Sequence, residues 1–381
     1  MKAIGRGALA LLLLCAWMAV PCGARAQGAA VQSAAERALA GMTLNEKVCQ
    51  LFFVRPEDFS RLSSVTKASA RLHNAQQKFA VGGVVLFPGN LKNGAQVSAL
   101  NAAMQQSAKE AHGIGLFIGV DEEGGGVARV ANTLKLAQAC AAASDIGATG
   151  DAEAAYEAGG GIGSYLSGYG FTLDFAPVAD VRADVKNAEI TARSFGTDAA
   201  LVSEMVGRFV SGLREQGVLA VLKHFPGHGA ASGSSHSGSA VSTRTAEDWR
   251  ACEWLPFQAG VAAGARVVMM SHQVAMAVDG ESPASLSYRI VTELLRGELG
   301  FDGIVITDAL RMDAVANEYS SGEACVQALL AGCDMLLLPK NFTNGYKGVV
   351  KALQEGRLTE ERVNESVLRI LRVKEAAGLL E

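Results

Sequence analysis

The chain has 381 residues, of which 49% are hydrophobic, and its formal net charge is -4. An acidic balance without a basic patch gives no electrostatic basis for binding nucleic acid or an anionic membrane surface. The length and apolar content are enough for one large domain or two ordinary ones. We therefore expect a globular protein without a nucleic-acid partner.

Residues 1–26 have the pattern of a secretory signal peptide. Lys2 and Arg6 precede an apolar run, 8–20, that is short for a bilayer span, and residues 24–26 (Ala-Arg-Ala) form a cleavage pattern. The mature chain is then expected to be 27–381, periplasmic or secreted, with no membrane contact beyond the signal segment. Cleavage removes three basic residues and no acidic one, which changes the formal charge from -4 to -7.

Five cysteines remain in the mature chain, an odd count without the paired spacing of a metal site. We expect these cysteines to be small core residues and not a disulfide framework.

Eight short β-rich runs alternate with longer helical stretches along the mature chain. The runs cover residues 50–54, 83–87, 116–120, 172–177, 218–224, 266–271, 303–307 and 334–338. The helical pattern is clearest in 199–215, where apolar residues recur at the spacing of one helix face behind Asp198, a good N-cap. Eight β-then-α units predict a single-domain α/β fold of the (β/α)8 TIM-barrel type, with a doubly wound open parallel sheet as the alternative.

Charged residues of both signs gather at the carboxyl ends of the predicted strands. In a (β/α)8 barrel, the active site lies at this end of the strands. The candidates, in chain order, are Asp121, Arg129, Arg193, Lys223, His224 and Asp308. The chain has no P-loop or Rossmann signature at these positions. The pattern therefore favours a small polyhydroxylated ligand over a nucleotide.

Four of the six histidines lie between positions 224 and 272, and this cluster has three interpretations. His224 and His228 have the i, i+4 spacing of zinc ligands, but Pro226 breaks the helix that this geometry needs. The histidines could instead be hydrogen-bonded supports of a loop. A catalytic or sugar-binding loop is favoured, because polar side chains at strand ends converge on ligands. We expect no metal.

The cluster also carries a family resemblance. Residues 223–229 (Lys-His-Phe-Pro-Gly-His-Gly), followed by Ser235 and His236, resemble the signature of glycoside hydrolase family three, in its β-N-acetylglucosaminidase branch. Residues 42–47, 174–180 and 285–303 resemble other segments of that family in the same order. The resemblance thus covers nearly all of the mature chain.

This resemblance implies a retaining exo-glycosidase that removes terminal β-linked N-acetylglucosamine, with peptidoglycan fragments as the expected source. It makes Asp308 the nucleophile and His236 the general acid/base. It assigns the sugar hydroxyls to Asp121, Arg129, Arg193, Lys223 and His224. It implies no cofactor, and we expect a monomer whose partner is a small carbohydrate.

The chemistry of these residue types agrees with the implied roles. A carboxylate close to cations stays ionised at neutral pH and can attack an anomeric carbon. Imidazole titrates near neutrality, so His236 can replace the second carboxylate of most retaining glycosidases.

Two positions depart from the family pattern. Ser234 stands where the family has an aspartate that orients the acid/base histidine, and Gly126 stands where it usually has an arginine. A β-glucosidase or β-xylosidase of the same family is an alternative function, although such relatives usually carry further domains. A catalytically weak sugar-binding protein is the other alternative, and Ser234 is the residue that suggests it.

Overall fold

The computed structural model describes residues 32–137, 139–183, 187–233, 238 and 240–380. The predicted signal peptide, Ser234 and His236 lie outside the described residues. The observations below concern the compact unit that begins at Ser33.

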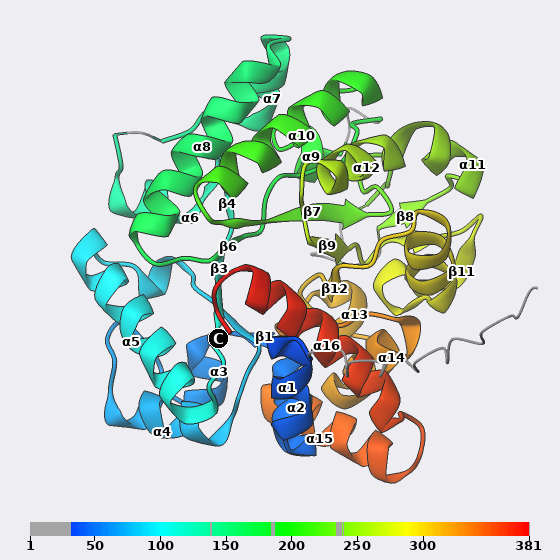
Figure 1. Cartoon of the computed structure of the whole chain (residues 1–381). Coiled ribbons are helices and arrows are strands. Elements are labelled where there is room, and N and C mark those ends of the chain that lie inside the picture. The colour runs from blue at the N-terminus through cyan, green and yellow to red at the C-terminus, as the bar shows by residue number, and fades with distance from the viewer. Residues whose placement is uncertain (1–31, 138, 184–186, 234–237, 239, 381) are drawn as a thin grey trace, which may run out of the picture. The chain divides into compact units, whose positions relative to one another are not determined.

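Eight parallel strands form the centre of this unit (Figure 1). They are β1 (Phe52–Val54), β2 (Gly83–Val85), β3 (Phe117–Val120), β6 (Leu173–Asp174), β7 (Leu219–Phe225), β9 (Val267–Met270), β12 (Ile304–Thr307) and β13 (Leu336–Leu337). Each strand pairs with the next one along the chain, and β13 pairs with β1 through Phe52 and Leu336. A parallel bridge between Ile306 and Met335 links β12 to β13.

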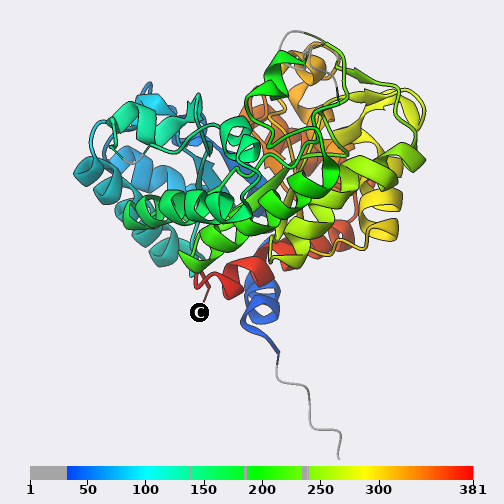
Figure 2. The same ribbon diagram turned by 90° about the horizontal axis from the view of Figure 1, so that it is seen from above.

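These pairings make a nearly closed barrel. Figure 2 shows the same ribbon turned by 90°, with helices covering the strands. The predicted (β/α)8 fold is therefore confirmed, and the open doubly wound sheet is wrong because its two edges would not meet. Each predicted run overlaps one observed strand. Most of the strands are shorter than predicted, whereas the fifth extends one residue further, to Phe225.

Helices surround the strands, and most of them connect one barrel strand to the next. The α-helices are α1 (Ala34–Gly41), α2 (Leu44–Gln50), α3 (Pro56–Ser60), α4 (Ala70–Lys78), α5 (Gly94–His112), α6 (Arg129–Leu134), α7 (Ala143–Ala148), α8 (Ala152–Gly168), α9 (Ala188–Thr191), α10 (Ala199–Glu215), α11 (Ala246–Asp248), α12 (Trp254–Ala262), α13 (Asp313–Ala316), α14 (Ser321–Ala331), α15 (Phe342–Gln354) and α16 (Glu360–Ala376). Two π-helices, η2 (Trp249–Glu253) and η4 (Arg289–Glu298), and two 3-10 turns, η1 (Pro88–Asn90) and η3 (Ala284–Leu286), complete the set.

Helix α10 forms as its sequence predicts. The Asp198 carboxylate accepts hydrogen bonds from the amides of Ala200 and Leu201, which satisfies two free N–H groups of the first turn. The predicted apolar face is buried along its whole length, from Val202 to Leu213. The face packs against α8 and α12, so burial of this stripe fixes the helix against the barrel.

Glycines allow the backbones of α8 and α10 to approach closely. A Cβ atom on Gly159 of α8 would lie 2.2 Å from the carbonyl oxygen of Phe209 in α10. In the other direction, a Cβ atom on Gly212 would lie 2.4 Å from the carbonyl oxygen of Tyr156. Side chains other than hydrogen would push the two helices apart, so these glycines are packing residues.

The core is continuous through the barrel, and every residue of β1, β2, β3, β9 and β12 is buried. Three of the five mature-chain cysteines, Cys49, Cys325 and Cys333, are buried and unpaired, as expected for small core residues. Cys140 and Cys252 are also unpaired but only half-buried.

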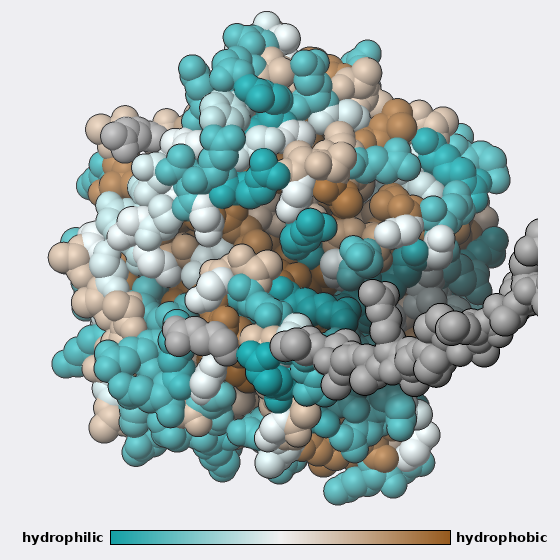
Figure 3. Space-filling view, viewed as in Figure 1, coloured by the Kyte–Doolittle hydropathy of each residue, from teal (hydrophilic) through white to brown (hydrophobic). Residues whose placement is uncertain are grey.

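On the face seen in Figure 3, hydrophobic residues are scattered among hydrophilic ones. Within the described ranges, no helix combines the length and apolar character that a membrane-spanning helix requires.

Two small sheets that the sequence pattern did not predict follow barrel strands. After β3, a hairpin joins β4 (Glu122–Gly124) to β5 (Val127–Ala128). A three-stranded sheet contains β8 (Val241–Ser242), β10 (Val274–Ala275) and β11 (Asp279–Pro283). Through these pairings, described parts of the segments that follow β3, β7 and β9 gain regular backbone hydrogen bonds.

Candidate active site

A cavity of about 470 Å³ lies at the carboxyl ends of the barrel strands. All the described residues that were predicted to act in the site line this cavity, namely Asp121, Arg129, Arg193, Lys223, His224 and Asp308. They come from the ends of four different strands and the segments that follow them, so only a closed barrel brings them together. Their individual roles stay predictions, and the two remaining predicted residues, Ser234 and His236, lie outside the described residues.

Glu123 is a residue of this cavity to which the sequence pattern gave no role. Its carboxylate accepts hydrogen bonds from Arg193, with Nε–Oε2 at 2.7 Å and Nη2–Oε1 at 2.8 Å. Lys223 Nζ lies 2.6 Å from Oε1 of the same carboxylate. Burial alone would raise the pKa of Glu123, but Lys223 and Arg193 lower it to about 2. Glu123 is therefore ionised and holds both cations in place.

Lys223 lies inside β7, and its side chain is almost fully buried between two carboxylates. Besides Glu123, its ammonium group donates a hydrogen bond to Asp121 Oδ1 at 3.1 Å. Burial would lower the pKa of Lys223, but Glu123 and then Asp121 raise it above its ordinary value. The lysine thus stays charged, and it fixes the position of Asp121 at the cavity wall.

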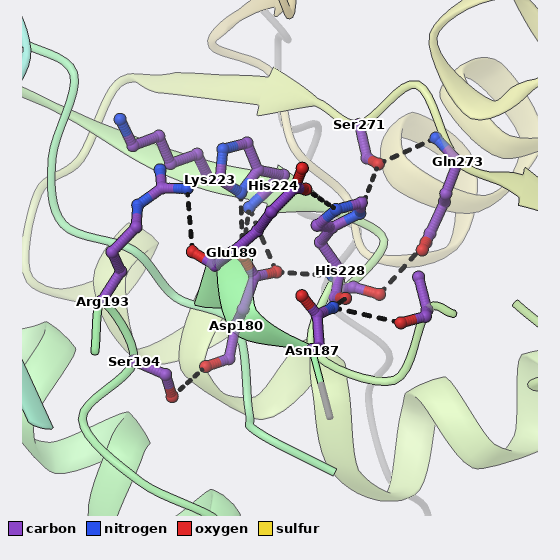
Figure 4. A network of polar contacts seen from close by, with 12 residues as sticks. Asp180, Asn187, Glu189, Arg193, Ser194, Lys223, His224, His228, Ser271 and Gln273 are labelled. Carbon is purple, nitrogen blue, oxygen red and sulfur yellow. Dashed lines mark hydrogen bonds and ion pairs between the residues drawn. The ribbon is translucent and has the colours of Figure 1, made fainter. Parts of the chain in front are cut away.

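Asp180 holds the end of β7 and the turn that follows it (Figure 4). Its buried carboxylate accepts a hydrogen bond from His224 Nδ1 at 2.8 Å and another from the backbone N–H of His228 at 2.6 Å. Because a carboxylate only accepts, His224 Nδ1 carries the proton. Burial lowers the pKa of His224 although Asp180 opposes this shift. The ring is therefore neutral at pH 7, and Nε2 is available to accept a hydrogen bond from a ligand hydroxyl.

His228 supports the loop and does not line the cavity. Its Nε2 atom is 3.3 Å from Glu189 Oε2, and its Nδ1 atom is 3.2 Å from Ser271 Oγ. Both ring nitrogens are thus engaged with protein groups. Among the described residues, no group of three or more His, Cys, Asp or Glu side chains is arranged to hold a metal ion.

Asp308 follows β12 and continues its ladder, since its amide donates to the carbonyl of Met270. The carboxylate Oδ1 accepts a hydrogen bond from the amide of Ala309 at 2.7 Å. Burial disfavours the charged form, but His224, His272, the Ala309 amide and Lys223 together hold the pKa of Asp308 below its ordinary value. Asp308 is therefore an ionised carboxylate that lines the cavity, which is the state that a carboxylate nucleophile requires.

His272 lies beside Asp308 and is held from both sides. Its Nε2 atom is 3.1 Å from the carbonyl oxygen of Ala309, and its Nδ1 atom is 2.7 Å from Ser285 Oγ. A carbonyl can only accept, so Nε2 carries the proton and Nδ1 accepts from the serine hydroxyl. His272 thereby holds the carbonyl group of Ala309, the residue whose N–H donates to Asp308.

The hairpin after β3 contains the run of three glycines at 124–126 and explains the first of them. Gly124 has φ +92°, and a Cβ atom there would lie 2.4 Å from the carbonyl oxygen of Ala141. Gly124 is therefore needed for the turn. Gly126 is different, because it is exposed and nothing lies within 4 Å of the place a Cβ would occupy. The arginine expected there from the family pattern would meet no steric obstacle near the backbone.

Glu122, next to Glu123, makes hydrogen bonds that stabilise the fold and does not line the cavity. Its two carboxylate oxygens accept from the amides of Val130 and Ala131 at the start of α6, and Oε1 also accepts from the hydroxyl of Tyr165. Alternation along β4 therefore sends one carboxylate to a helix N-terminus and the next to the cavity.

The chain belongs to glycosyl hydrolase family 3. The model of that family's N-terminal domain matches residues 43–373, which is most of the chain. The match covers all eight barrel strands and every residue that lines the cavity.

Several known proteins are similar over most of the chain. Beta-hexosaminidase A of Pseudoalteromonas piscicida is 32% identical over 82% of this chain and 56% of its own length. A beta-hexosaminidase of Stenotrophomonas maltophilia is 36% identical over 72% of this chain and 80% of its own length. The structure of a family 3 β-N-acetylglucosaminidase from Paenibacillus superposes with a TM-score of 0.80 at 35% identity, covering 88% of this chain and 63% of that one. The chain thus spans little more than half of some relatives.

Proposed function

We propose that this protein is a retaining exo-glycosidase that hydrolyses terminal β-linked N-acetylglucosamine. One observation carries the proposal, namely that an ionised carboxylate, Asp308, shares one cavity with the five residues assigned to the sugar hydroxyls. The names of the similar proteins, which are hexosaminidases and a β-N-acetylglucosaminidase, support the same substrate class.

In the first step, an oxygen of the Asp308 carboxylate forms a bond to the anomeric carbon while the bond from that carbon to the aglycone oxygen breaks. His236 gives its proton to the departing oxygen. In the second step, neutral His236 takes a proton from water, the water oxygen bonds to the anomeric carbon, and the bond to Asp308 breaks. The sugar keeps its β configuration, and both residues return to their starting states.

The remaining residues of the cavity bind and orient the sugar. Lys223 and Arg193 present charged donors, Asp121 is an acceptor, and His224 offers its free Nε2 atom to a hydroxyl. Arg129 has a buried Nε atom without a hydrogen-bond partner among the described residues, which suits a donor that a ligand completes. Apolar walls from residues such as Phe175, Met269 and Leu337 exclude water from the reacting centre.

We also propose that the protein acts outside the cytoplasm on fragments of peptidoglycan. The signal-peptide pattern of residues 1–26 supports export, and N-acetylglucosamine is a sugar of the material found there. Release of N-acetylglucosamine from purified muropeptides by the protein, and accumulation of uncleaved fragments without it, would support this part of the proposal.

Hydrolysis of p-nitrophenyl glycosides tests the proposed activity directly. We expect turnover of the β-N-acetylglucosaminide and little turnover of the β-glucoside or β-xyloside. Faster turnover of the β-glucoside or β-xyloside would favour the alternative enzyme. Binding of N-acetylglucosamine without turnover of any substrate would identify a sugar-binding protein.

A further inference from the structure

The segment 227–244, which follows β7, contacts the side chain of Glu253 near both of its ends (Figure 1 labels β7 and β8). At the start of the segment, Gly227 has φ +129°, and a Cβ atom on it would lie 2.6 Å from the Cβ atom of Glu253. At its end, Arg244 Nε lies 3.0 Å from Glu253 Oε1. Glu253 therefore contacts the beginning and the end of the same loop.

The Glu253 carboxylate has little else to compensate its charge. Its side chain is fully buried, and neither oxygen makes a hydrogen bond of good geometry within the described part of the chain. The ion pair with the partly exposed Arg244 is thus the contact that offsets the loss of water. Glu253 is also the last residue of the π-helix η2, a rare local geometry that often occurs near functional sites.

The segment itself is closed by backbone hydrogen bonds. Ser232 and Val241 exchange two N–H···O bonds, each 2.8 Å long. Val241 begins β8, which pairs with β10 of the three-stranded sheet, and Arg244 follows β8 directly. His236, outside the described residues, stands in the sequence between these two paired residues. Ser232 and Val241 thus form a paired base on either side of the stretch of sequence that contains His236.

We propose that Glu253 is a positioning residue for the general acid/base. Through Arg244 and Gly227 it sets where the base of the segment 232–241 lies relative to Asp308. This inference rests on the proposed function, because it needs His236 as the proton donor. Glu253 does not touch the substrate in this scheme.

The substitution Glu253→Gln tests the proposal because it keeps the Cβ and Cγ atoms that Gly227 meets and removes only the charge facing Arg244. A misplaced proton donor slows substrates with poor leaving groups, whereas activated aryl glycosides leave with little protonation. We expect kcat/KM for phenyl β-N-acetylglucosaminide to fall on the order of tenfold, and that for the 2,4-dinitrophenyl glycoside to stay within about twofold. Arg244→Gln should give the same pattern, and the double variant should be no worse than either single one.

His236→Ala and the inhibition constant of N-acetylglucosamine are the controls. If Glu253→Gln slows both glycosides equally, or neither, while His236→Ala selectively slows the phenyl glycoside, the positioning role is wrong and the proposed function stands. If His236→Ala has no selective effect, the acid/base assignment fails and the proposal fails with it. Weaker inhibition by N-acetylglucosamine in Glu253→Gln would show that the sugar site itself has changed, and would also overturn the positioning role.

Discussion

Lys223 and Glu123 form an ion pair across the top of the barrel, with Nζ and Oε1 2.6 Å apart. Lys223 belongs to β7 and Glu123 to the hairpin after β3, and β6 lies between these two barrel strands. Arg193 completes the group on the other side of the same carboxylate. The two cations assigned to the sugar are thus held by the protein before any substrate binds.

Glu123→Gln should therefore weaken substrate binding more than it slows chemistry. An amide cannot neutralise two cations, so Lys223 and Arg193 would repel each other and shift. We expect KM for a β-N-acetylglucosaminide to rise roughly tenfold or more, with a smaller change in kcat, measured by steady-state kinetics. Glu122→Gln is not a suitable control because it disturbs α6, whereas Glu157→Gln on the surface of α8 should change neither constant. A kcat that falls while KM stays fixed would contradict this role.

The same carboxylate should contribute to the acid sensitivity of the fold. The pKa of Glu123 is lowered to about 2 in the folded protein, below its ordinary value of 4.5. A lowered folded-state pKa gives stability that is present above pH 4.5 and is lost as the pH falls toward 2, on the order of 3 kcal/mol. The free energy of unfolding of Glu123→Gln should therefore depend less on pH in this window than that of the native protein. Urea titrations at several pH values measure this free energy. If it depends on pH equally in the two proteins, Glu123 does not contribute to the acid sensitivity.

Asp308→Ala should abolish turnover and leave the fold intact. The residue follows a strand and lines the cavity, so its loss removes the proposed nucleophile without opening the core. We expect kcat to fall by at least about 10³-fold with an unchanged circular dichroism spectrum. A variant whose KM rises while kcat stays within a few-fold would show that Asp308 only binds a hydroxyl.

Ser234→Asp should make the enzyme faster. A carboxylate two residues before His236 can accept a hydrogen bond from the ring and stabilise the imidazolium, whereas serine can only accept the hydrogen bond. Since charge-assisted hydrogen bonds are about twice as strong as neutral ones, the gain should be roughly ten- to thirty-fold in kcat. It should appear with poor leaving groups more than with activated aryl glycosides. No gain with either, together with loss of poor-leaving-group turnover in His236→Ala, would place the orienting partner elsewhere.

Two glycines of α8 should respond to alanine in opposite directions. Gly159→Ala places a Cβ 2.2 Å from the carbonyl of Phe209, so the helices must separate and the protein should lose about 2 kcal/mol or more. Gly161→Ala meets nothing within 4 Å and gains helix propensity, so it should be neutral or stabilising by up to about 1 kcal/mol. Thermal unfolding of the pair measures both effects. Equal melting temperatures would refute the close packing of α8 on α10.

Much of the barrel could be predicted because its strands are buried on both faces and therefore read as short apolar runs. The charged residues that end these runs could then be grouped, since parallel strands place their carboxyl ends at one side. Asp121, Lys223 and Asp308 were found in this way.

The parts that could not be predicted depend on contacts between distant segments. Strands β4 and β5 have two or three residues each, too few for a periodic pattern. Glu122 and Glu123 are neighbours of the same type, and only the pleat of β4 decides which one enters the cavity. The role of Glu253 could not be predicted either. Its partners Gly227 and Arg244 lie 26 and 9 residues before it, and no periodic pattern of the sequence relates these positions.

The hydrogen bonds of His272 have a consequence for how this protein's pH dependence can be interpreted. Its proton is fixed on Nε2 by the carbonyl of Ala309, and burial lowers its pKa, as it does for His224. The lowered pKa values of His272 and His224 place their titration below the ordinary range of imidazole. A bend in kcat/KM near pH 6.5 would therefore not come from these two rings, and its loss in His236→Ala would assign it to the proposed proton donor.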